Sequence, residues 1–425
     1  MTRWIYNLIA IFTNGILTIV SKFNQKNKIS KILFGRKNSL VDIQNLNSSL
    51  PKIWIHTASL GEFEMAIPLI LELNQQYHCC ITFFSPSGFE NAQLPQNCSK
   101  YYLQNDSISK AKQWIKFLDP QIAIFVKYEF WINHLHELNS RQIPFVYWNI
   151  LLRKNHFLGS FWGQKWRSEL NQCKKFFAQN LETEQLLKKW ISPKSNVEVL
   201  GDARYLRAAQ LRESAKDVPP SIIEFCQHSD VLILGSCWDE EVEVLRETLS
   251  KLKFPESYRY IVAPHDLSEA RIQKIQKTLS NPDSHVFRFS QISDPSEVNV
   301  PRKEKINIGI LDSIGWLSRT YHWGDIALVG GGFGKGLHNI IEPLAAGCFV
   351  LFGPETDKFP EAIDTINADV AAQGNNILDL SEKLANTLNR DDFHELRGQV
   401  NQYFNQKIKP ISQAKNEICN YILTN

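Results

Sequence analysis

Short apolar runs recur along most of this chain, and many are followed by loops rich in glycine, serine and charged residues. Apolar runs bounded in this way predict buried strands of a parallel sheet. The predicted strands are residues 52–57, 78–84, 122–126, 144–148, 176–179, 197–200, 231–234, 258–262, 306–311, 326–329 and 349–352. The same pattern predicts helices at 63–73 and 338–346, and two helices in 391–423 that are broken near Pro410.

The stretch 325–359 has the outline of a nucleotide-binding βαβ unit. A predicted strand runs directly into a glycine-rich loop, a helix and a second strand. Glycines let a ligand approach the backbone closely, and the N–H groups at a helix start can bind phosphate. Asn339 and Glu342 are three residues apart and should share one helix face, where a carboxylate can accept both ribose hydroxyls. A tight turn in any α/β protein would explain the glycines alone equally well.

The spacing of this stretch, GGGxGKGxHNxxEPLAAG followed by FGPETDKF, is more specific. It resembles the donor-binding segment of the 3-deoxy-D-manno-octulosonic acid (Kdo) transferases of lipopolysaccharide synthesis, glycosyltransferase family 30. The resemblance implies an α/β fold of the GT-B type, in which two Rossmann-like domains face each other across a cleft. It also implies transfer of Kdo from CMP-Kdo to the lipid A precursor lipid IVA. The residues expected to contact CMP-Kdo are Pro264, His265, Ser313, Ile314, Gly315, Gly332, Gly334, Lys335, Asn339, Ile340, Ile341 and Glu342.

Glu62 is the candidate general base. It comes near the start of the predicted helix 63–73, where the helix dipole favours a carboxylate, and a capping role would explain it as simply as catalysis. The surrounding segment, WIHTASLGEFEMA, resembles the acceptor-domain motif in which the family's base is the glutamate after glycine. The resemblance therefore favours a catalytic role for Glu62.

Further charged residues follow the predicted strands of the first half, where ligands of open α/β sheets bind. The segment KYEFWxN resembles the family motif ETELWPN, with Glu129 matching and Lys127 replacing the first glutamate. Arg204 stands where the family's GNLK motif has lysine, which keeps the charge but changes its geometry. We expect Glu62, Glu129 and Arg204 to be catalytic. The expected acceptor-binding residues are Ser59, Gly61, Ser85, Ser87, Lys127 and Arg153.

Two departures from the family pattern leave alternatives open. Pro264 stands where the family commonly has the arginine of Pro-Arg-His, and Trp316 replaces the glutamate of its D-[ST]-x-G-E-L loop. A catalytically inactive, membrane-attached assembly protein would tolerate both changes. Another GT-B enzyme that uses a UDP-sugar would account for the same glycine loop. Retention of Glu62, Asn339 and Glu342 favours an active Kdo transferase.

Composition narrows the possibilities further. A chain of 425 residues can form two domains, and a net charge of +3 argues against a nucleic-acid partner. Eight cysteines without a CxxC pair argue against a zinc site and against a disulfide scaffold. No DxD motif or His/Asp cluster is evident, so we expect transfer that needs no metal. The family resemblance further implies that the transfer is inverting.

The predicted organisation begins with a membrane anchor and basic flank, 1–45. Residues 4–21 carry no charge and approach the roughly 20 residues that span a bilayer. The basic residues around them predict attachment to the inner membrane, with the catalytic domains on the cytoplasmic face. A buried amphipathic first helix is the alternative. The basic flank contains Arg3, Lys22, Lys26, Lys28, Lys31, Arg36 and Lys37.

The remaining boundaries follow from the strand pattern. We expect an acceptor-binding domain at 46–210, a linker at 211–221 that contains Pro219-Pro220, and a CMP-Kdo-binding domain at 222–390. By resemblance to GT-B proteins, 391–425 should return to the first domain. Within the first domain, 151–157 is expected to form a mobile basic-aromatic loop near the lipid.

Overall fold

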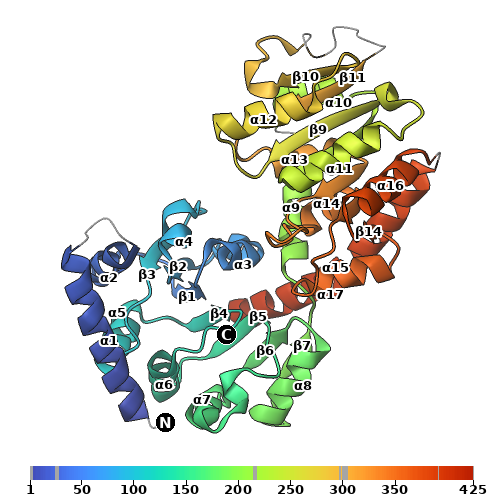
Figure 1. Ribbon diagram of the computed structural model, residues 1–425. Coiled ribbons are helices and arrows are strands. Elements are labelled where there is room, and N and C mark those ends of the chain that lie inside the picture. Colours follow the sequence, from blue (N-terminus) through green and yellow to red (C-terminus); the bar gives the residue numbers. More distant parts are fainter. Residues whose placement is uncertain are drawn as a thin grey trace. The chain divides into compact units, whose positions relative to one another are not determined.

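The computed structural model describes residues 3–23, 28–213, 218–295, 298, 305–390 and 392–424. The chain forms two compact units, each built around its own sheet (Figure 1). The first unit comprises residues 1–207 and 409–425, and the second comprises 208–408. Lys26 of the basic flank and residues 214–217 of the predicted linker lie outside the described residues.

The first unit contains a seven-stranded parallel sheet in the order β3-β2-β1-β4-β5-β6-β7. Its central strands are buried on both faces, because helices cover the sheet on both sides. Three tryptophans without any exposed surface, Trp54, Trp114 and Trp148, lie in this unit. Its strands are β1 (Lys52–Thr57), β2 (His78–Phe83), β3 (Cys98–Tyr102), β4 (Ile122–Val126), β5 (Phe145–Ile150), β6 (Lys175–Ala178) and β7 (Val197–Val199).

The helices of the first unit precede and connect these strands. They are α1 (Arg3–Phe23), α2 (Lys28–Gln44), α3 (Leu60–Leu73), α4 (Pro86–Asn91), α5 (Ile108–Leu118), α6 (Ile132–Ser140), α7 (Gln164–Leu170) and α8 (Leu181–Trp190). Two short 3-10 turns, η1 (Phe157–Gly159) and η2 (Phe161–Gly163), follow β5. Helix α9 (Arg204–Glu213) leads from the first unit into the second and occupies the start of the predicted linker.

The second unit repeats this architecture with the strand order β10-β11-β9-β8-β12-β13-β14. The strands are β8 (Asp230–Cys237), β9 (Tyr258–Pro264), β10 (Ser284–Arg288), β11 (Ile306–Ile310), β12 (Ile326–Val329), β13 (Phe349–Phe352) and β14 (Ala371–Gln373). The helices are α10 (Pro220–Cys226), α11 (Asp239–Leu249), α12 (Glu269–Leu279), α13 (Leu317–Thr320), α14 (Ile341–Ala346), α15 (Pro360–Asn367) and α16 (Ile377–Leu388). Short 3-10 turns are η3 (Pro255–Ser257), η4 (Phe289–Gln291) and η6 (Tyr321–Trp323). The predicted α/β architecture of two Rossmann-like domains is confirmed.

The last helix, α17 (Phe393–Thr424), is continuous, so the predicted break near Pro410 is wrong. Proline removes a helical N–H and crowds the preceding turn, which disfavours it inside a helix. Packing on both sides compensates, since Phe404 is buried before the proline and Ile411 after it. The helix starts in the second unit and ends in the first, where the Tyr77 hydroxyl donates to the Ile422 carbonyl at 2.7 Å.

The N-terminal segment forms α1, which docks on the first unit along one side. The ring of Tyr6 lies edge-on to Trp166 at 5.3 Å between centroids, and the Asn7 side chain accepts a hydrogen bond from the Ile108 N–H at 2.8 Å. Within the described residues, no helix combines the length and the hydropathy that crossing a bilayer requires. Large apolar side chains on the undocked face stay exposed, with Trp4 and Phe12 each 70% exposed.

Candidate active site

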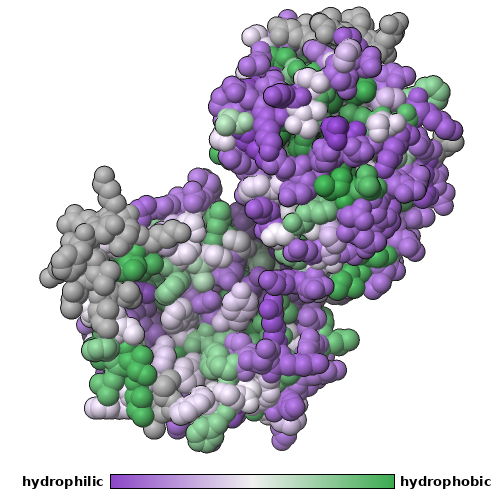
Figure 2. Space-filling model, viewed as in Figure 1, coloured by the Kyte–Doolittle hydropathy of each residue, from purple (hydrophilic) through white to green (hydrophobic). Residues whose placement is uncertain are grey.

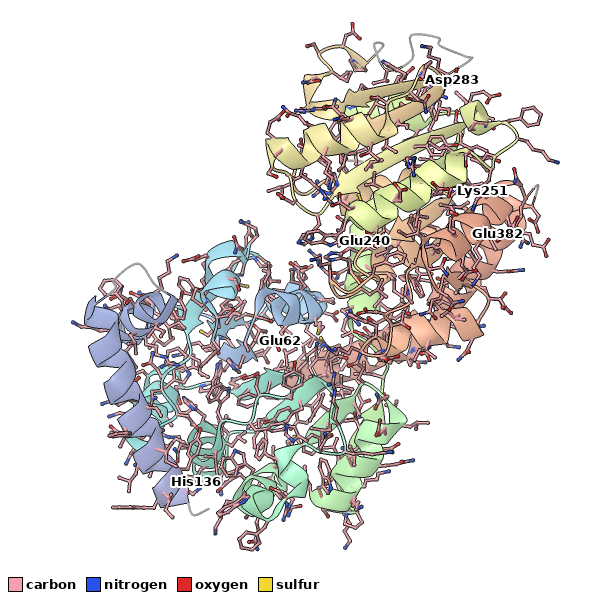
Figure 3. The ribbon with its side chains drawn as sticks, in the orientation of Figure 1. Glu62, His136, Glu240, Lys251, Asp283 and Glu382 are labelled. Atoms are coloured by element: carbon pink, nitrogen blue, oxygen red, sulfur yellow. The ribbon has the colours of Figure 1, made fainter. Side chains whose placement is uncertain are left out.

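Glu62 lies in the first turn of α3, directly after the carboxyl end of β1 (Figure 3). Its Oε2 accepts hydrogen bonds from the Ala58 N–H at 2.5 Å and the Ser59 N–H at 3.1 Å. The other oxygen, Oε1, makes no hydrogen bond with any described residue. Glu62 is only 6% exposed, so most of this carboxylate is removed from water. It therefore caps the helix with one oxygen and keeps the other available for a proton.

The loop after β2 packs against the start of α3 and carries two predicted acceptor residues. The Ser85 N–H donates to the Ala58 carbonyl at 2.9 Å, and Ser85 caps α4. A Cβ on Gly88 would come within 3.1 Å of backbone atoms of Ser59, so glycine permits this close approach. Ser87 lies beside Ser85, with 3.2 Å between their hydroxyl oxygens.

A buried polar network underlies Glu129, and its members were not predicted from the sequence. His56, at the end of β1, has no exposed surface, and its Nδ1 lies 2.8 Å from the Thr82 hydroxyl. The Trp131 indole N–H is shared between His56 Nε2, at 3.0 Å, and Glu129 Oε2, at 2.9 Å. His56 Nε2 also lies 3.3 Å from the same Glu129 oxygen, so a proton on Nε2 would be donated to that carboxylate. The Trp54 indole also donates to Thr82 at 2.8 Å. One donor thus fixes the carboxylate of Glu129 against a buried imidazole.

The charges of these neighbouring groups change the pKa of Glu62. Burial raises the pKa of Glu62, and the negative charge of Glu129 raises it further. The pKa is lowered by smaller effects of His56, the Ala58 N–H and Lys127. Lys127 itself takes a left-handed backbone conformation, φ +62°, immediately after β4. Glu62, Glu129 and Lys127 are therefore close enough to influence one another's charge, whereas the sequence predicted Lys127, Glu129 and Arg153 at one rim.

The other predicted residues of the first unit are placed around this group. Nothing lies within 4 Å of a Cβ added to Gly61, so the surface beside Glu62 is open. Arg153 is exposed on the loop after β5. Arg204 opens α9, and its Nε donates to Asp202 at 2.9 Å, which leaves the side chain 30% exposed.

In the second unit, the glycine loop after β12 is held by a buried carboxylate. Glu241 accepts hydrogen bonds from the Gly331 N–H at 2.9 Å and the Trp238 N–H at 2.8 Å, and burial raises its pKa. Gly331 has φ +91°, and a Cβ there would lie 2.1 Å from the Gly336 carbonyl oxygen. Only glycine fits this position. Glu241 was missed in the sequence because it is far from the loop in the chain.

Aromatic rings stack beside this loop. His265 stacks on both Trp238 and His338, with 4.6 Å between the centroids of each pair, and the Trp238 indole N–H donates to His338 Nε2 at 3.4 Å. The ammonium of Lys335 lies 5.6 Å from the Trp238 centroid, within cation–π range. Burial lowers the pKa of His338, and His265 lowers it further. The stack gives the predicted His265 and Lys335 a shared surface on which an anion or a base could lie.

The predicted ribose pair is in contact, although the helix is shorter than expected. Asn339 precedes α14 and does not share a helix face with Glu342, so that part of the prediction is wrong. Its Oδ1 accepts from the Ile341 N–H at 3.0 Å, a local turn that replaces the first helical turn. Its Nδ2 donates to Glu342 Oε1 at 2.9 Å. The amide and the carboxylate therefore still form one polar unit.

Some of the residues expected to contact CMP-Kdo have side chains that are buried in the core of the second unit. Ile340 and Ile341 are 1% and 0% exposed, so their side chains belong to the core. Pro264 is also buried, at the end of β9. In contrast, Ile314 is 89% exposed on the loop after β11. The remaining predicted residues, Ser313, Gly315, Gly332 and Gly334, lie on the loops after β11 and β12.

Comparison of the amino-acid sequence with known proteins shows which family this chain belongs to. The family model described as 3-deoxy-D-manno-octulosonic-acid transferase (kdotransferase) matches residues 28–207. The chain is 30% identical over 328 residues to the 3-deoxy-D-manno-octulosonic acid transferase of Haemophilus influenzae, covering 74% of each protein. The chain belongs to the Kdo transferase family. It is 25% identical over 375 residues to the transferase of the same name from Chlamydophila psittaci, covering 82% of this chain and 79% of that protein. It is therefore a glycosyltransferase.

Solved structures match this Kdo transferase at the level of the fold. The UDP-GlcNAc 2-epimerase of Neisseria meningitidis, bound to UDP-GlcNAc, matches with a TM-score of 0.56 and 15% identity, over 88% of this chain and 100% of that chain. A putative UDP-N-acetylglucosamine 2-epimerase of Listeria monocytogenes matches with a TM-score of 0.55 and 14% identity, over 83% and 91%. Both share the fold of two Rossmann-like domains.

Proposed function

We propose that this Kdo transferase moves Kdo from CMP-Kdo to lipid IVA, with inversion and without a metal, at the cytoplasmic face of the inner membrane. An acceptor hydroxyl oxygen attacks the anomeric carbon of Kdo while the bond from that carbon to the CMP phosphate oxygen breaks. The bonding electrons leave with CMP, and Glu62 accepts the hydroxyl proton. The observation that carries this proposal is the buried Glu62, whose pKa is raised by burial and by the partly buried Glu129, at the carboxyl edge of the first sheet.

The environment of Glu62 suits a general base. A carboxylate whose pKa is raised by burial and by a neighbouring negative charge holds a proton more strongly than one in water. Oε2 is anchored by the Ala58 and Ser59 N–H groups, and this fixes the direction of the free Oε1. In the proposed mechanism, Glu129 supplies the neighbouring charge, and His56 with Trp131 holds it in position.

The second unit supplies groups suited to a nucleotide monophosphate. We propose that the N–H groups of the glycine loop and the Lys335 ammonium stabilise the departing phosphate. His265 and His338 lie beside Trp238, the ring that the Lys335 ammonium contacts. A cytosine ring or a phosphate could be recognised there. Glu342, supported by Asn339, would accept the ribose hydroxyls.

The proposal is tested directly with the purified full-length chain, CMP-Kdo and lipid IVA. The expected product is heavier than the acceptor by whole Kdo units, and the mass spectrum also gives their number. CMP release without a glycolipid product would point to hydrolysis, and an unchanged acceptor would contradict the proposed function. Replacing CMP-Kdo by UDP-sugars in parallel tests the other donor class.

EDTA should leave the rate of this reaction unchanged. The CMP-linked donor carries one phosphate, and the Lys335 ammonium with the N–H groups of the glycine loop can stabilise its developing charge. Within the described residues, no group of three or more histidine, cysteine, aspartate or glutamate side chains could hold a metal ion. The rate is measured before and after chelation and again with Mg²⁺ added. Loss of activity that Mg²⁺ restores would contradict transfer without a metal.

The exposed face of α1 supports membrane attachment. Figure 2 shows hydrophobic residues gathered on the N-terminal turns of this helix. The exposed apolar side chains of α1 include Leu8 at 51% exposure and Phe12 at 70%. Because the other face is docked through Tyr6, we propose that α1 lies in the membrane interface rather than across the bilayer.

Changing both Leu8 and Phe12 to glutamine should move part of the protein from the membrane pellet to the supernatant. The two side chains lose apolar contact with lipid, while docking through Tyr6 persists. Attachment that remains should weaken at high salt, because basic residues attract anionic lipid through screened charge. A double change of exposed leucines elsewhere, Leu71→Gln with Leu378→Gln, is the matched control. An unaltered distribution for the α1 variant would rule out this attachment.

A further inference from the structure

A cavity of about 600 Å³ in the first unit has no role in the reaction proposed above. It lies between the loop after β5 and the end of α8. The side chains of Lys154, His156, Ser160, Arg167, Lys189 and Trp190 line it. No described acidic side chain lines it, although Glu182 lies 3.9 Å from Lys154 outside the lining. The positive charge of the side chains that line this cavity therefore favours binding of an anion.

Arg167 is fixed at one side of this cavity. Its Nη1 donates to the Leu158 carbonyl at 2.5 Å and the Ser160 carbonyl at 2.8 Å. These two bonds hold the guanidinium plane, while Nε and Nη2 have no hydrogen-bond partner among the described residues. A held guanidinium with free donors matches the geometry of a phosphate, to which arginine binds through two N–H groups.

Lys189 adds a charge that the fold does not neutralise. Its neighbour Lys188 pairs with Glu184 at 2.7 Å, whereas Lys189 has no ion pair with any described residue. Lys189 and Arg167 line the same cavity. Two uncompensated cations favour a dianion over a single negative charge, and a phosphate monoester is close to a dianion at neutral pH.

The loop that forms this cavity also exposes aromatic side chains. Phe161 is 76% exposed and Trp162 is 62% exposed. The loop packs against α8, since a Cβ on Gly159 would lie 2.6 Å from the Trp190 ring. Phe157 and Trp162 also line a second, mainly apolar cavity of about 400 Å³ that reaches Glu129. Exposed aromatic rings beside basic residues are typical of a membrane interface.

We propose that the cavity lined by Arg167 and Lys189 binds the phosphate monoester of a membrane lipid. Arg167 donates its free N–H groups to two phosphate oxygens, and Lys189 neutralises the second charge. The inference rests on the proposed function only in taking the acceptor to be a membrane lipid. It assigns a role to the predicted basic-aromatic loop, in which Lys154 and His156 line the site.

The first test measures binding of the full chain to phosphatidylcholine vesicles. One set contains phosphatidic acid, a phosphate monoester, and another contains phosphatidylserine at equal surface charge. We expect tighter binding to phosphatidic acid, and a loss of about fivefold in that binding for Lys189→Ala. Lys188→Ala removes the same charge from the next residue, outside the cavity, and should leave binding unchanged. Circular dichroism checks that both variants are folded.

The second test separates an acceptor phosphate from the bulk lipid. In neutral detergent micelles, KM is measured for lipid IVA and for its dephosphorylated form. If the cavity binds an acceptor phosphate, Lys189→Ala raises KM for lipid IVA about fivefold at unchanged kcat, and leaves the dephosphorylated acceptor unaffected. If it binds bulk lipid, only the vesicle measurement changes. Either result supports the site.

Identical behaviour of the Lys189→Ala and Lys188→Ala variants in both tests would overturn the site. So would equal binding of the wild type to phosphatidic acid and phosphatidylserine vesicles combined with an unchanged KM of Lys189→Ala for lipid IVA, because the cavity would then show no preference for a phosphate monoester. Failure of the proposed function is seen separately, as the absence of a Kdo-containing product with the wild-type protein. The vesicle test remains decisive for the cavity in that case.

Discussion

Replacing Glu62 with glutamine should lower turnover by about 10²–10⁴-fold, the usual contribution of a positioned acid or base. Glutamine has nearly the same shape, and its carbonyl oxygen can still accept from the Ala58 and Ser59 N–H groups. The cap of α3 should therefore survive while proton acceptance is lost. Turnover is measured at saturating CMP-Kdo, with CMP affinity and circular dichroism as checks on the fold.

The matched control is Glu72→Gln, the same change at the other end of α3, where Glu72 pairs with Lys415. It should keep turnover close to that of the wild type. If Glu62→Gln retained turnover within a few-fold of wild type, Glu62 would not be the base.

The pH profile distinguishes loss of a base from misplacement of the substrate. A base acts when it is deprotonated, so the rate falls as the pH falls through the pKa of Glu62. Burial and the charge of Glu129 raise that pKa, and the acidic fall should therefore occur at a higher pH than for an exposed glutamate. The residual rate of Glu62→Gln should lack this fall.

Replacing Glu342 with alanine should weaken CMP binding by about 1.5–3 kcal/mol, the value of a hydrogen bond to a charged group. The change removes the carboxylate that Asn339 supports, while the glycine loop is held independently by Glu241. KM for the acceptor should not change, because the acceptor is assigned to the first unit.

Calorimetry with CMP measures this effect. Glu382→Ala, an exposed glutamate on α16 of the same unit (Figure 3), controls for the loss of one negative charge. CMP affinity that is equal in the two variants would show that Glu342 does not bind the ribose.

The strands were predictable where the sheet is covered on both faces. In β4 every residue is buried, and its apolar run was recognised with its observed bounds, 122–126. The edge strands β3, β10 and β14 were missed, because their solvent-facing positions hold residues such as Lys100 and His285. An edge strand is defined by its pairing to a neighbour, and a short polar sequence does not encode that pairing.

The site was predictable where its residues belong to one continuous motif. Glu62 and the glycine loop follow strands in a recognisable order. The network of His56, Thr82 and Trp131 could not be predicted from the sequence. Thr82 is 26 residues and Trp131 is 75 residues from His56 in the chain. Parallel pairing of β1 with β2 places His56 beside Thr82, and only the folded sheet creates that contact.

The course of α17 bears on the order in which the protein is made and folds. A ribosome makes residues 409–425 after the whole of the second unit, yet these residues belong to the first unit. The bond from Tyr77 to Ile422 joins positions 345 residues apart, so it forms only after the second unit has been synthesised. During translation, domains generally fold from the N-terminus onward, but here the earlier domain is completed only once α17 has been made. Until α17 has been made, the nascent first domain therefore exposes the surface that this helix will cover.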